Sequence, residues 1–224
     1  MQRKNSVLTI IVVILLASFF ILSSCSSKTS EVTTLPGAEV KEYEGENLSA
    51  ISAFRENSIK GPQHVDISTY QLQVTGLVTQ SESYTYDEVI NDFDKYKKVV
   101  RLDCVEGWSV NLLWEGLKVK DIVKEAQPLS TARVVIFHAY DGYTTSFPIE
   151  YVMDNDILLA YKMNDVVIPP ERGFPFQLVA EEKWGYKWIK WVTEIEFSDD
   201  INYRGYWEQR GYSNSGDLDK GFFE

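Results

Sequence analysis

Short apolar segments separated by polar turns run through most of the chain, and several of them alternate with the period of a strand. The segment "YQLQVTGLV" (70–78) alternates apolar and polar residues and ends at a glycine turn, so it predicts a strand. Lys97–Asp103 predicts a second strand and Val110–Leu113 a third. The apolar run "ARVVIFHAY" (132–140) predicts a buried strand that ends at "DGYTTS".

The second half of the chain adds further strands. The segment "DILLAYKMNDVVIPP" (156–170) predicts a hairpin with its turn near Asn164–Asp165. The runs "FQLVA" (176–180) and "IKWVTEIEF" (189–197) predict two more strands.

Helical periodicity is confined to two short segments. Val89, Ile90 and Phe93 have helical spacing within residues 86–96, and "LKVKDIVKEA" (117–126) predicts a second helix. Short strands therefore outnumber short helices, and they do not alternate with helices in a regular βαβ order. We predict a β-rich α+β fold in a single domain.

The N-terminus has the pattern of a lipoprotein signal. Residues 1–24 begin with Arg3 and Lys4, continue through an apolar run, and end in the small residues of "LSSC". In such signals the cysteine, here Cys25, becomes the lipidated N-terminus of the mature protein. An uncleaved membrane anchor is the alternative, because the apolar run approaches the roughly 18 residues of a spanning helix. Both interpretations predict a cell-membrane protein that is anchored on the extracytoplasmic face.

Composition divides the rest of the chain. Residues 25–47 are rich in Ser, Thr and Glu, which predicts a flexible tether. Residues 48–213 are long enough for one domain with a sizeable core. Residues 214–224 lack periodicity, and we expect a loose C-terminal tail.

Net charge limits the classes of partner. The chain has 22 Lys and Arg against 33 Asp and Glu, a net charge of −11. Without residues 1–24, which hold two basic residues and no acidic ones, it is near −13. Such acidity argues against nucleic acid as a partner, because binding to phosphates requires a basic face.

If Cys25 is lipidated, Cys104 in "RLDCVEGWS" is the single thiol of the mature protein. Outside the cytoplasm an unpaired cysteine is unusual, although a buried cysteine acting as a small hydrophobe is common. His64 and His138, the two histidines, are far apart and lack metal-ligand spacing, so a zinc site is not expected. A catalytic pair in which His138 activates Cys104 as a nucleophile is a further alternative, although the sequence near Cys104 lacks the residues that usually surround such a nucleophile.

Residues 171–191, "ERGFPFQLVAEEKWGYKWIKW", place several lysines among aromatic residues in an otherwise acidic chain. One interpretation is an amphipathic strand with its aromatic side chains inward. The other is a cluster of cations and backbone donors that holds a phosphate or another anion.

Several segments in this order resemble the molybdopterin-binding domain of the sulfite oxidase family. They are "RLDCVEGWS", "WEGLKVKDIV", "DGYTTSFPIEYVMDNDILLAYKMN", "IPPERGFPFQLV", "WGYKWIKWV" and "YWEQRGY". The resemblance covers roughly residues 54–212, and it implies a mixed-sheet sulfite-oxidase-type fold with a molybdenum–molybdopterin cofactor. It also implies that Cys104 is the molybdenum ligand, since a soft thiolate suits a metal with other sulfur ligands.

The same resemblance implies roles for residues outside the cysteine motif. Arg55 would lie beside the metal and Tyr212 would point at the reacting oxygen, so both are candidate catalytic residues with Cys104. The residues that would contact the cofactor are Arg55, Glu56, Asn57, Asp141, Arg172, Gln177, Lys187, Trp188, Ile189 and Lys190.

Two positions depart from the family pattern. Arg172 stands where the family usually has histidine or asparagine, and Gln177 stands where it usually has a phosphate-binding arginine. We expect Arg172 to supply the missing cation from its nearby position.

The function implied is oxygen-atom transfer to or from a small sulfur or nitrogen compound. We expect neither the dimerisation domain nor the haem domain of full sulfite oxidases. We therefore expect a monomer that exchanges electrons with a membrane or extracytoplasmic haem protein. The alternative is a non-catalytic lipoprotein that retains the fold and binds an anion or a protein.

Overall fold

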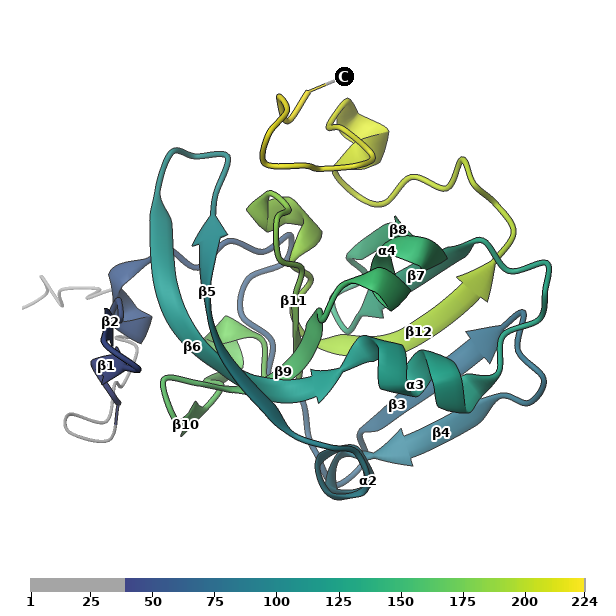
Figure 1. Ribbon diagram of the computed structural model, residues 1–224, viewed down its shortest axis with the longest axis horizontal. Coiled ribbons are helices and arrows are strands. Elements are labelled where there is room, and N and C mark those ends of the chain that lie inside the picture. Colours follow the sequence, from purple (N-terminus) through teal and green to yellow (C-terminus); the bar gives the residue numbers. More distant parts are fainter. Residues whose placement is uncertain (1–38, 224) are drawn as a thin grey trace, which may run out of the picture. The chain divides into compact units, whose positions relative to one another are not determined.

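The computed structural model describes residues 39–223. Two five-stranded β-sheets form the framework of this part of the chain (Figure 1). The predicted signal (1–24), the lipidation at Cys25 and most of the predicted tether lie outside the described residues.

The first sheet has five strands that pair antiparallel, in the order β10-β9-β6-β5, with β11 also paired to β9. Its strands are β5 (Tyr96–Asp103), β6 (Ser109–Lys118), β9 (Leu158–Met163), β10 (Val166–Val167) and β11 (Gln177–Val179). The predicted hairpin is confirmed: Asn164 and Asp165 form its turn with φ of 48° and 65°. Such left-handed conformations are typical of Asn and Asp in hairpin turns.

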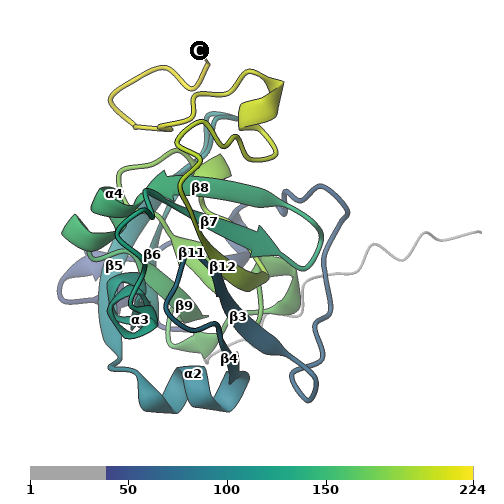
Figure 2. The same ribbon diagram turned by 90° about the vertical axis from the view of Figure 1, so that its right-hand side faces the viewer.

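The second sheet has the order β4-β3-β12-β7-β8, and β12 is parallel to β3 but antiparallel to β7 (Figure 2). Its strands are β3 (Gln71–Gly76), β4 (Glu82–Thr85), β7 (Val134–Ala139), β8 (Thr144–Pro148) and β12 (Val192–Ser198). The predicted strand 189–197 begins only at Val192, because the chain turns at Trp191, where φ is 53°. The preceding residues are therefore free to line a pocket.

Between residues 39 and 223, three short α-helices connect the strands: α2 (Tyr86–Asp92), α3 (Val119–Ala126) and α4 (Ile149–Asp154). Thr85 caps α2 by a reciprocal arrangement with Glu88: the Glu88 amide donates to Thr85 Oγ1, and the Thr85 amide donates to Glu88 Oε2 at 2.7 Å. The strands β4 and β8 and the helix α4 are absent from the sequence prediction. Their segments are too short for a period to be recognised.

One hydrophobic core joins both sheets and α3. It includes Trp114 of β6, Phe137 of β7, Ile122 of α3 and Leu72 of β3, each at most 1% exposed. Gly116 allows β6 to approach β9 closely, since a Cβ there would lie 2.2 Å from the Leu159 carbonyl oxygen. The short strands, the few short helices and the single core confirm the predicted β-rich α+β class. The remaining helical residues lie in four 3₁₀ turns of the described chain: η1 (Ile51–Ala53), η2 (Pro170–Arg172), η3 (Gly185–Lys187) and η4 (Glu208–Arg210).

Two segments predicted to lack structure are ordered where they are described. Within the predicted tether, β1 (Glu42–Tyr43) and β2 (Glu46–Asn47) form a small hairpin, with Glu44 and Gly45 at its turn. The predicted loose tail packs through a bridge between Lys183 and Asp217. The hairpin is a local pairing within the polar segment, whereas the tail pairs with a residue distant in sequence, which local composition does not reveal.

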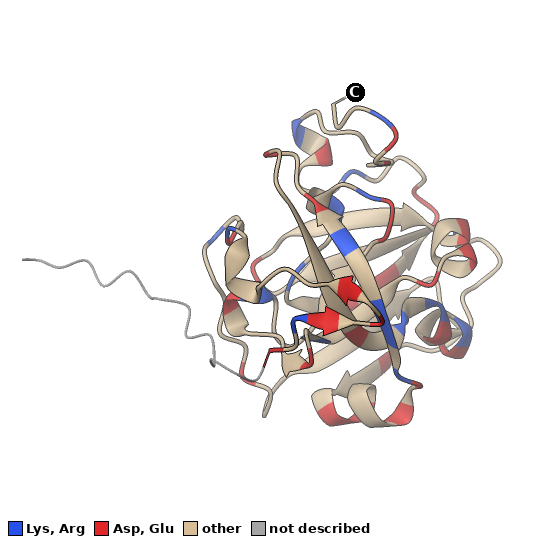
Figure 3. Ribbon diagram, turned by 60° about the vertical axis from the view of Figure 1, so that its left-hand side comes forward, with Lys and Arg blue, Asp and Glu red and all other residues tan. Residues whose placement is uncertain are grey.

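Charges are unevenly distributed over the elements. Asp87 and Glu88 lie on α2, whereas Lys97 and Lys98 lie on β5 (Figure 3). Basic residues can therefore be grouped locally even though the net charge of the chain is negative. Of the helices between residues 39 and 223, none is both long enough and apolar enough to span a bilayer.

Asp217→Asn is expected to lower the free energy of unfolding at pH 7 by about 1–2 kcal/mol. Burial opposes ionisation of Asp217, but its ion pairs with Lys183 and Lys220 outweigh burial and hold its pKa well below the ordinary value. A carboxyl whose folded-state pKa is depressed contributes stability above its unfolded pKa of about 4, and this contribution is lost as the pH falls further. Urea unfolding of both proteins at pH 7 and pH 3 measures the effect.

The difference between wild type and Asp217→Asn should shrink at pH 3. Asp219→Asn is the matched control, because Asp219 is an exposed neighbour, and it should change the free energy of unfolding little at either pH. A constant difference at both pH values would show that the ion pairs do not anchor this segment.

Candidate active site

A cavity of about 390 Å³ is lined by residues from six separate stretches of the chain. These are residues 54–59, residues 102–108 at the end of β5 and in the turn that follows it, the loop after β7, the segment from η2 to β11, residues 185–191, and the C-terminal segment around η4. The C-terminal segment lies at the same end of the described chain as the turn between β5 and β6 (Figures 1 and 2).

Cys104 lies in the turn that joins β5 to β6. Its amide donates to the Trp108 carbonyl at 2.9 Å, and its carbonyl accepts from the Gly107 amide at 3.0 Å. Gly107 has φ of 86°, which favours glycine. A tight, hydrogen-bonded turn therefore fixes the backbone of the half-buried cysteine at the cavity wall.

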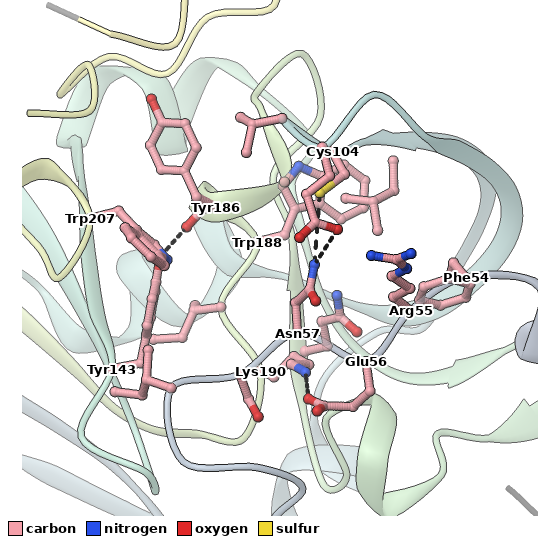
Figure 4. A pocket seen from close by; sticks show the side chains of 18 of the residues that line it. Phe54, Arg55, Glu56, Asn57, Cys104, Tyr143, Tyr186, Trp188, Lys190 and Trp207 are labelled. Atoms are coloured by element: carbon pink, nitrogen blue, oxygen red, sulfur yellow. Dashed lines mark hydrogen bonds and ion pairs between the residues drawn. The ribbon is translucent and has the colours of Figure 1, made fainter. Parts of the chain in front are cut away.

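Polar side chains from two segments surround the thiol. Asn57 Nδ2 lies 4.0 Å from Cys104 Sγ and donates to Glu106 Oε2 at 3.1 Å (Figure 4). Burial raises the pKa of the Cys104 thiol, the Glu106 carboxylate adds to this, and hydrogen bonds from the Glu106 backbone and Asn57 oppose it. The thiol by itself is therefore a poor nucleophile, whereas a bound metal ion would deprotonate it.

Arg172, Gln177 and Lys190 meet at another part of the cavity wall. Gly173 brings them together, because a Cβ there would lie 3.1 Å from Gln177 Cβ and 3.2 Å from Lys190 Cβ. Arg172 is 4% exposed, and its Nη2 donates to the Phe54 carbonyl at 2.7 Å. Its Nε has no hydrogen-bond partner in the structure. A buried guanidinium with an unused donor is a binding group for an anion.

Lys190 lies beside this arginine and is mostly buried. Its Nζ forms an ion pair with Glu56 Oε1 at 2.5 Å (Figure 4). Burial lowers the pKa of Lys190, and Glu56 opposes the change. The cluster thus holds two cations, Arg172 and Lys190, and the carboxylates of Glu56, Glu171 and Asp141 lie close enough to act on them.

Asp141 and Tyr143 follow β7 and line the next part of the wall. Asp141 is 3% exposed, and its Oδ1 accepts from the Tyr143 amide at 2.9 Å. The Tyr143 hydroxyl donates to the Tyr186 carbonyl at 2.5 Å. The Asp141 carboxylate thus accepts a hydrogen bond from the backbone through Oδ1. It also lines the cavity, where it can act as a hydrogen-bond acceptor.

The C-terminal segment forms the remaining wall. Trp207 and Tyr212 line the cavity, and their ring centroids are 5.1 Å apart. The Tyr212 ring also contacts the Tyr186 ring, with centroids at 5.0 Å. Aromatic packing therefore positions Tyr212.

Lys187 does not line the cavity. Its side chain is fully buried, and its Nζ donates to Glu208 Oε1 at 2.7 Å, to the Ser146 carbonyl at 2.8 Å and to the Asn214 carbonyl at 3.0 Å. All three donors of the ammonium group are used. This placement corrects the expectation of a cofactor contact: Lys187 holds η4 and the C-terminal segment against β8.

The other residues named from the resemblance come together in the cavity. They are Arg55, Glu56, Asn57, Cys104, Asp141, Arg172, Gln177, Trp188, Ile189, Lys190 and Tyr212. The sequence analysis missed Glu106 and the aromatic residues Phe54, Trp108 and Trp207. Each of these lies within five residues of a named position, so the local motifs contained the signal.

Comparison with known proteins places this cavity in a family context. A family model described as "Oxidoreductase molybdopterin binding domain" matches residues 59–207. The chain is 34% identical over 157 residues to the uncharacterised oxidoreductase YuiH of Bacillus subtilis, covering 70% of this chain and 78% of that protein. It is 30% identical over 151 residues to the putative protein-methionine-sulfoxide reductase subunit YedZ1 of Azospira oryzae, covering 67% and 57%.

Other similarities are more distant. The methionine-sulfoxide reductase catalytic subunit MsrP of Xanthomonas campestris is 28% identical over 63% of this chain and 49% of its own. The sulfane dehydrogenase SoxCD of Paracoccus pantotrophus has the same fold, with a TM-score of 0.59 and 22% identity over 62% of this chain and 41% of that chain. The match thus spans about half the length of MsrP and less than half of the SoxCD chain.

Proposed function

Since the chain belongs to the oxidoreductase molybdopterin-binding family that includes the sulfite oxidases, we propose that it transfers an oxygen atom to or from a small sulfur or nitrogen compound. One observation carries this proposal. A thiol, an arginine, a buried carboxylate and a cationic cluster, from segments far apart in sequence, line the same cavity. The similarity to YedZ1 and MsrP favours a sulfoxide as the substrate.

The cavity suits the cofactor that the family implies. Arg172, with an unpaired buried Nε, and Lys190 supply positive charge for the terminal phosphate of a pterin. Gln177 adds amide donors, and Asp141 adds an acceptor for ring N–H groups of the pterin. A buried anion needs such partners, and these residues provide them.

Residues near Cys104 have separate roles in the proposed reaction. When bound, molybdopterin supplies a molybdenum centre that exchanges two electrons with the substrate. Cys104 would ligate the metal through its thiolate. Arg55 would orient a polar oxide by charge-assisted hydrogen bonds, and Tyr212 would donate a hydrogen bond to the substrate oxygen.

We extend the proposal to cellular location on the N-terminal signal alone. Lipidation at Cys25 would tether the protein to the cell membrane on its extracytoplasmic face. The electron partner would be a haem protein in or near that membrane, and the protein would act as a monomer.

Metal analysis of the purified protein tests the enzymatic proposal. The expected molybdenum content is close to one atom per chain, with a pterin present in equal amount. Protein from a host that makes the cofactor, yet containing no molybdenum or pterin, would instead fit the non-catalytic binding module.

Lys190→Ala is expected to lower molybdenum and pterin content by roughly 10-fold or more. The phosphate would then keep Arg172 as its one cationic partner in the cluster, and Glu56 would lose its ion pair. Gln177→Arg, which adds a cation, should leave occupancy unchanged or raise it. The measurement is metal and pterin content per folded protein.

Lys98→Ala is the matched control, because Lys98 pairs with Glu181 and does not line the cavity. Its cofactor content should equal that of wild type. Full occupancy in Lys190→Ala would mean that the phosphate is bound elsewhere.

A further inference from the structure

A second group of potential metal ligands lies on the sheet that contains β7 and β12, outside the cavity. We propose that His138, Glu194 and Glu196 form a binding site for a divalent transition-metal cation of the zinc class. The sequence analysis predicted no zinc site, because it compared the histidines only with each other. This inference does not depend on the proposed function.

Strand pairing brings the three side chains to one face. Strands β7 and β12 lie side by side (Figure 2). His138 of β7 pairs directly with Glu194 of β12, and Glu196 lies two residues further along β12. Residues two apart in a strand face the same side. The irregular register between Val192 and Glu194 ends before the two glutamates. Regular pairing from Glu194 onward therefore places Glu194 and Glu196 on the same face of the sheet as His138.

The ligand atoms are close enough for one ion. One ligand atom from each residue lies within 4.8 Å of the other two, and His138 Nε2 is 2.8 Å from Glu196 Oε2. Ligands about 2.1 Å from a tetrahedral zinc ion lie about 3.4 Å apart. Small changes in the side-chain torsions of the partly exposed glutamates would bring the ligand atoms from their present separations to this spacing.

The chemistry of this ligand set selects the class of metal. One imidazole and two carboxylates suit zinc and related ions, whereas calcium and magnesium prefer oxygen ligands alone. Three protein ligands leave a fourth position for water or another ligand. A cluster of carboxylates alone, without the imidazole, would not favour zinc over calcium or magnesium.

The surroundings favour a cation as well. The Thr75 hydroxyl donates to Glu194 Oε1 at 2.6 Å and orients that carboxylate, as an outer partner orients a metal ligand. In the described part of the chain, no lysine or arginine is ion-paired with either glutamate; His138 is the basic partner of Glu196. Two neighbouring carboxylates thus share a single ionisable base, and a divalent cation would compensate their charge.

The position gives the ion a structural role. β7 leads into Asp141, and β12 follows Lys190 and Trp191, so both strands connect directly to the cavity wall. The Tyr140 amide donates to the Trp191 carbonyl at 2.9 Å just beyond the strands. A cation bound by both strands would hold these two parts of the wall together.

Zinc titration of the full-length, chelator-treated protein tests the site. We expect wild type to bind one zinc ion more than His138→Ala, whose residual affinity at this site should be at least about 100-fold weaker. His64→Ala is the matched control, because His64 is the other histidine of the chain and is exposed. It should keep the wild-type stoichiometry, and so any zinc on Cys25 or Cys104 cancels in the comparison.

Three further measurements strengthen the test. Thr75→Val should weaken zinc binding by about 10-fold, and saturating zinc should raise the unfolding temperature of wild type by about 5 °C but not that of His138→Ala. Cobalt should give visible ligand-field bands that are lost in His138→Ala. Equal zinc stoichiometry and affinity in wild type and His138→Ala would overturn the proposal and leave an ordinary His138–Glu196 ion pair.

Discussion

Cys104→Ser is expected to lower the molybdenum content and the oxygen-transfer activity by more than about 100-fold. Loss of an outer partner of a metal ligand already costs about 10–100-fold in affinity or activity, and this change removes the proposed ligand itself. A serine hydroxyl is a harder, more basic donor, which suits a sulfur-bound metal poorly. Metal analysis, pterin content and turnover of an S-oxide substrate should be measured on the same preparation.

The unfolding temperature of Cys104→Ser should stay close to that of the cofactor-free wild type, because the exchange is nearly isosteric and the residue is half-buried. Cys25→Ser is the matched control, since it removes the other cysteine. This control should keep its molybdenum and lose membrane attachment. Undiminished molybdenum in Cys104→Ser would exclude Cys104 as the ligand.

Lys187→Ala is expected to lower the free energy of unfolding by about 3–5 kcal/mol. Lys187 and Glu208 are both fully buried and form an ion pair at 2.7 Å. Without the ammonium group, Glu208 Oε1 keeps the Thr145 hydroxyl at 2.8 Å, while its Oε2 already has no hydrogen-bond partner. An uncompensated buried carboxylate is the cause of the loss, and urea unfolding at neutral pH measures it.

The double variant Lys187→Met with Glu208→Gln should recover much of this loss, because it buries no charge. Lys98→Ala breaks a more exposed ion pair and should cost less than about 1 kcal/mol. If Lys187→Ala costs no more than Lys98→Ala, the pair does not anchor the C-terminal segment.

Local pattern was sufficient for most of the fold. The alternation in residues 70–78 and the Asn164–Asp165 turn predicted β3 and the β9–β10 hairpin correctly. Both signals depend on neighbours in the sequence: the period of two, and the left-handed conformation that Asn and Asp tolerate. The cavity was predicted through motif order, and its separate segments do meet around Cys104.

The sequence by itself therefore determined most of the strands, the fold class and about half of the residues that line the cavity. Only the tertiary structure separated Lys187 from Lys190, which stand three residues apart in the same motif. Lys187 ends η3 and is enclosed by Glu208 and two carbonyls, whereas Lys190 reaches the cavity before the chain turns at Trp191. Pairing of β7 with β12 likewise placed His138 beside Glu194 and Glu196. The physical reason is common to both: hydrophobic period is set by adjacent residues, but the partner of a buried charge or a strand is chosen by long-range packing.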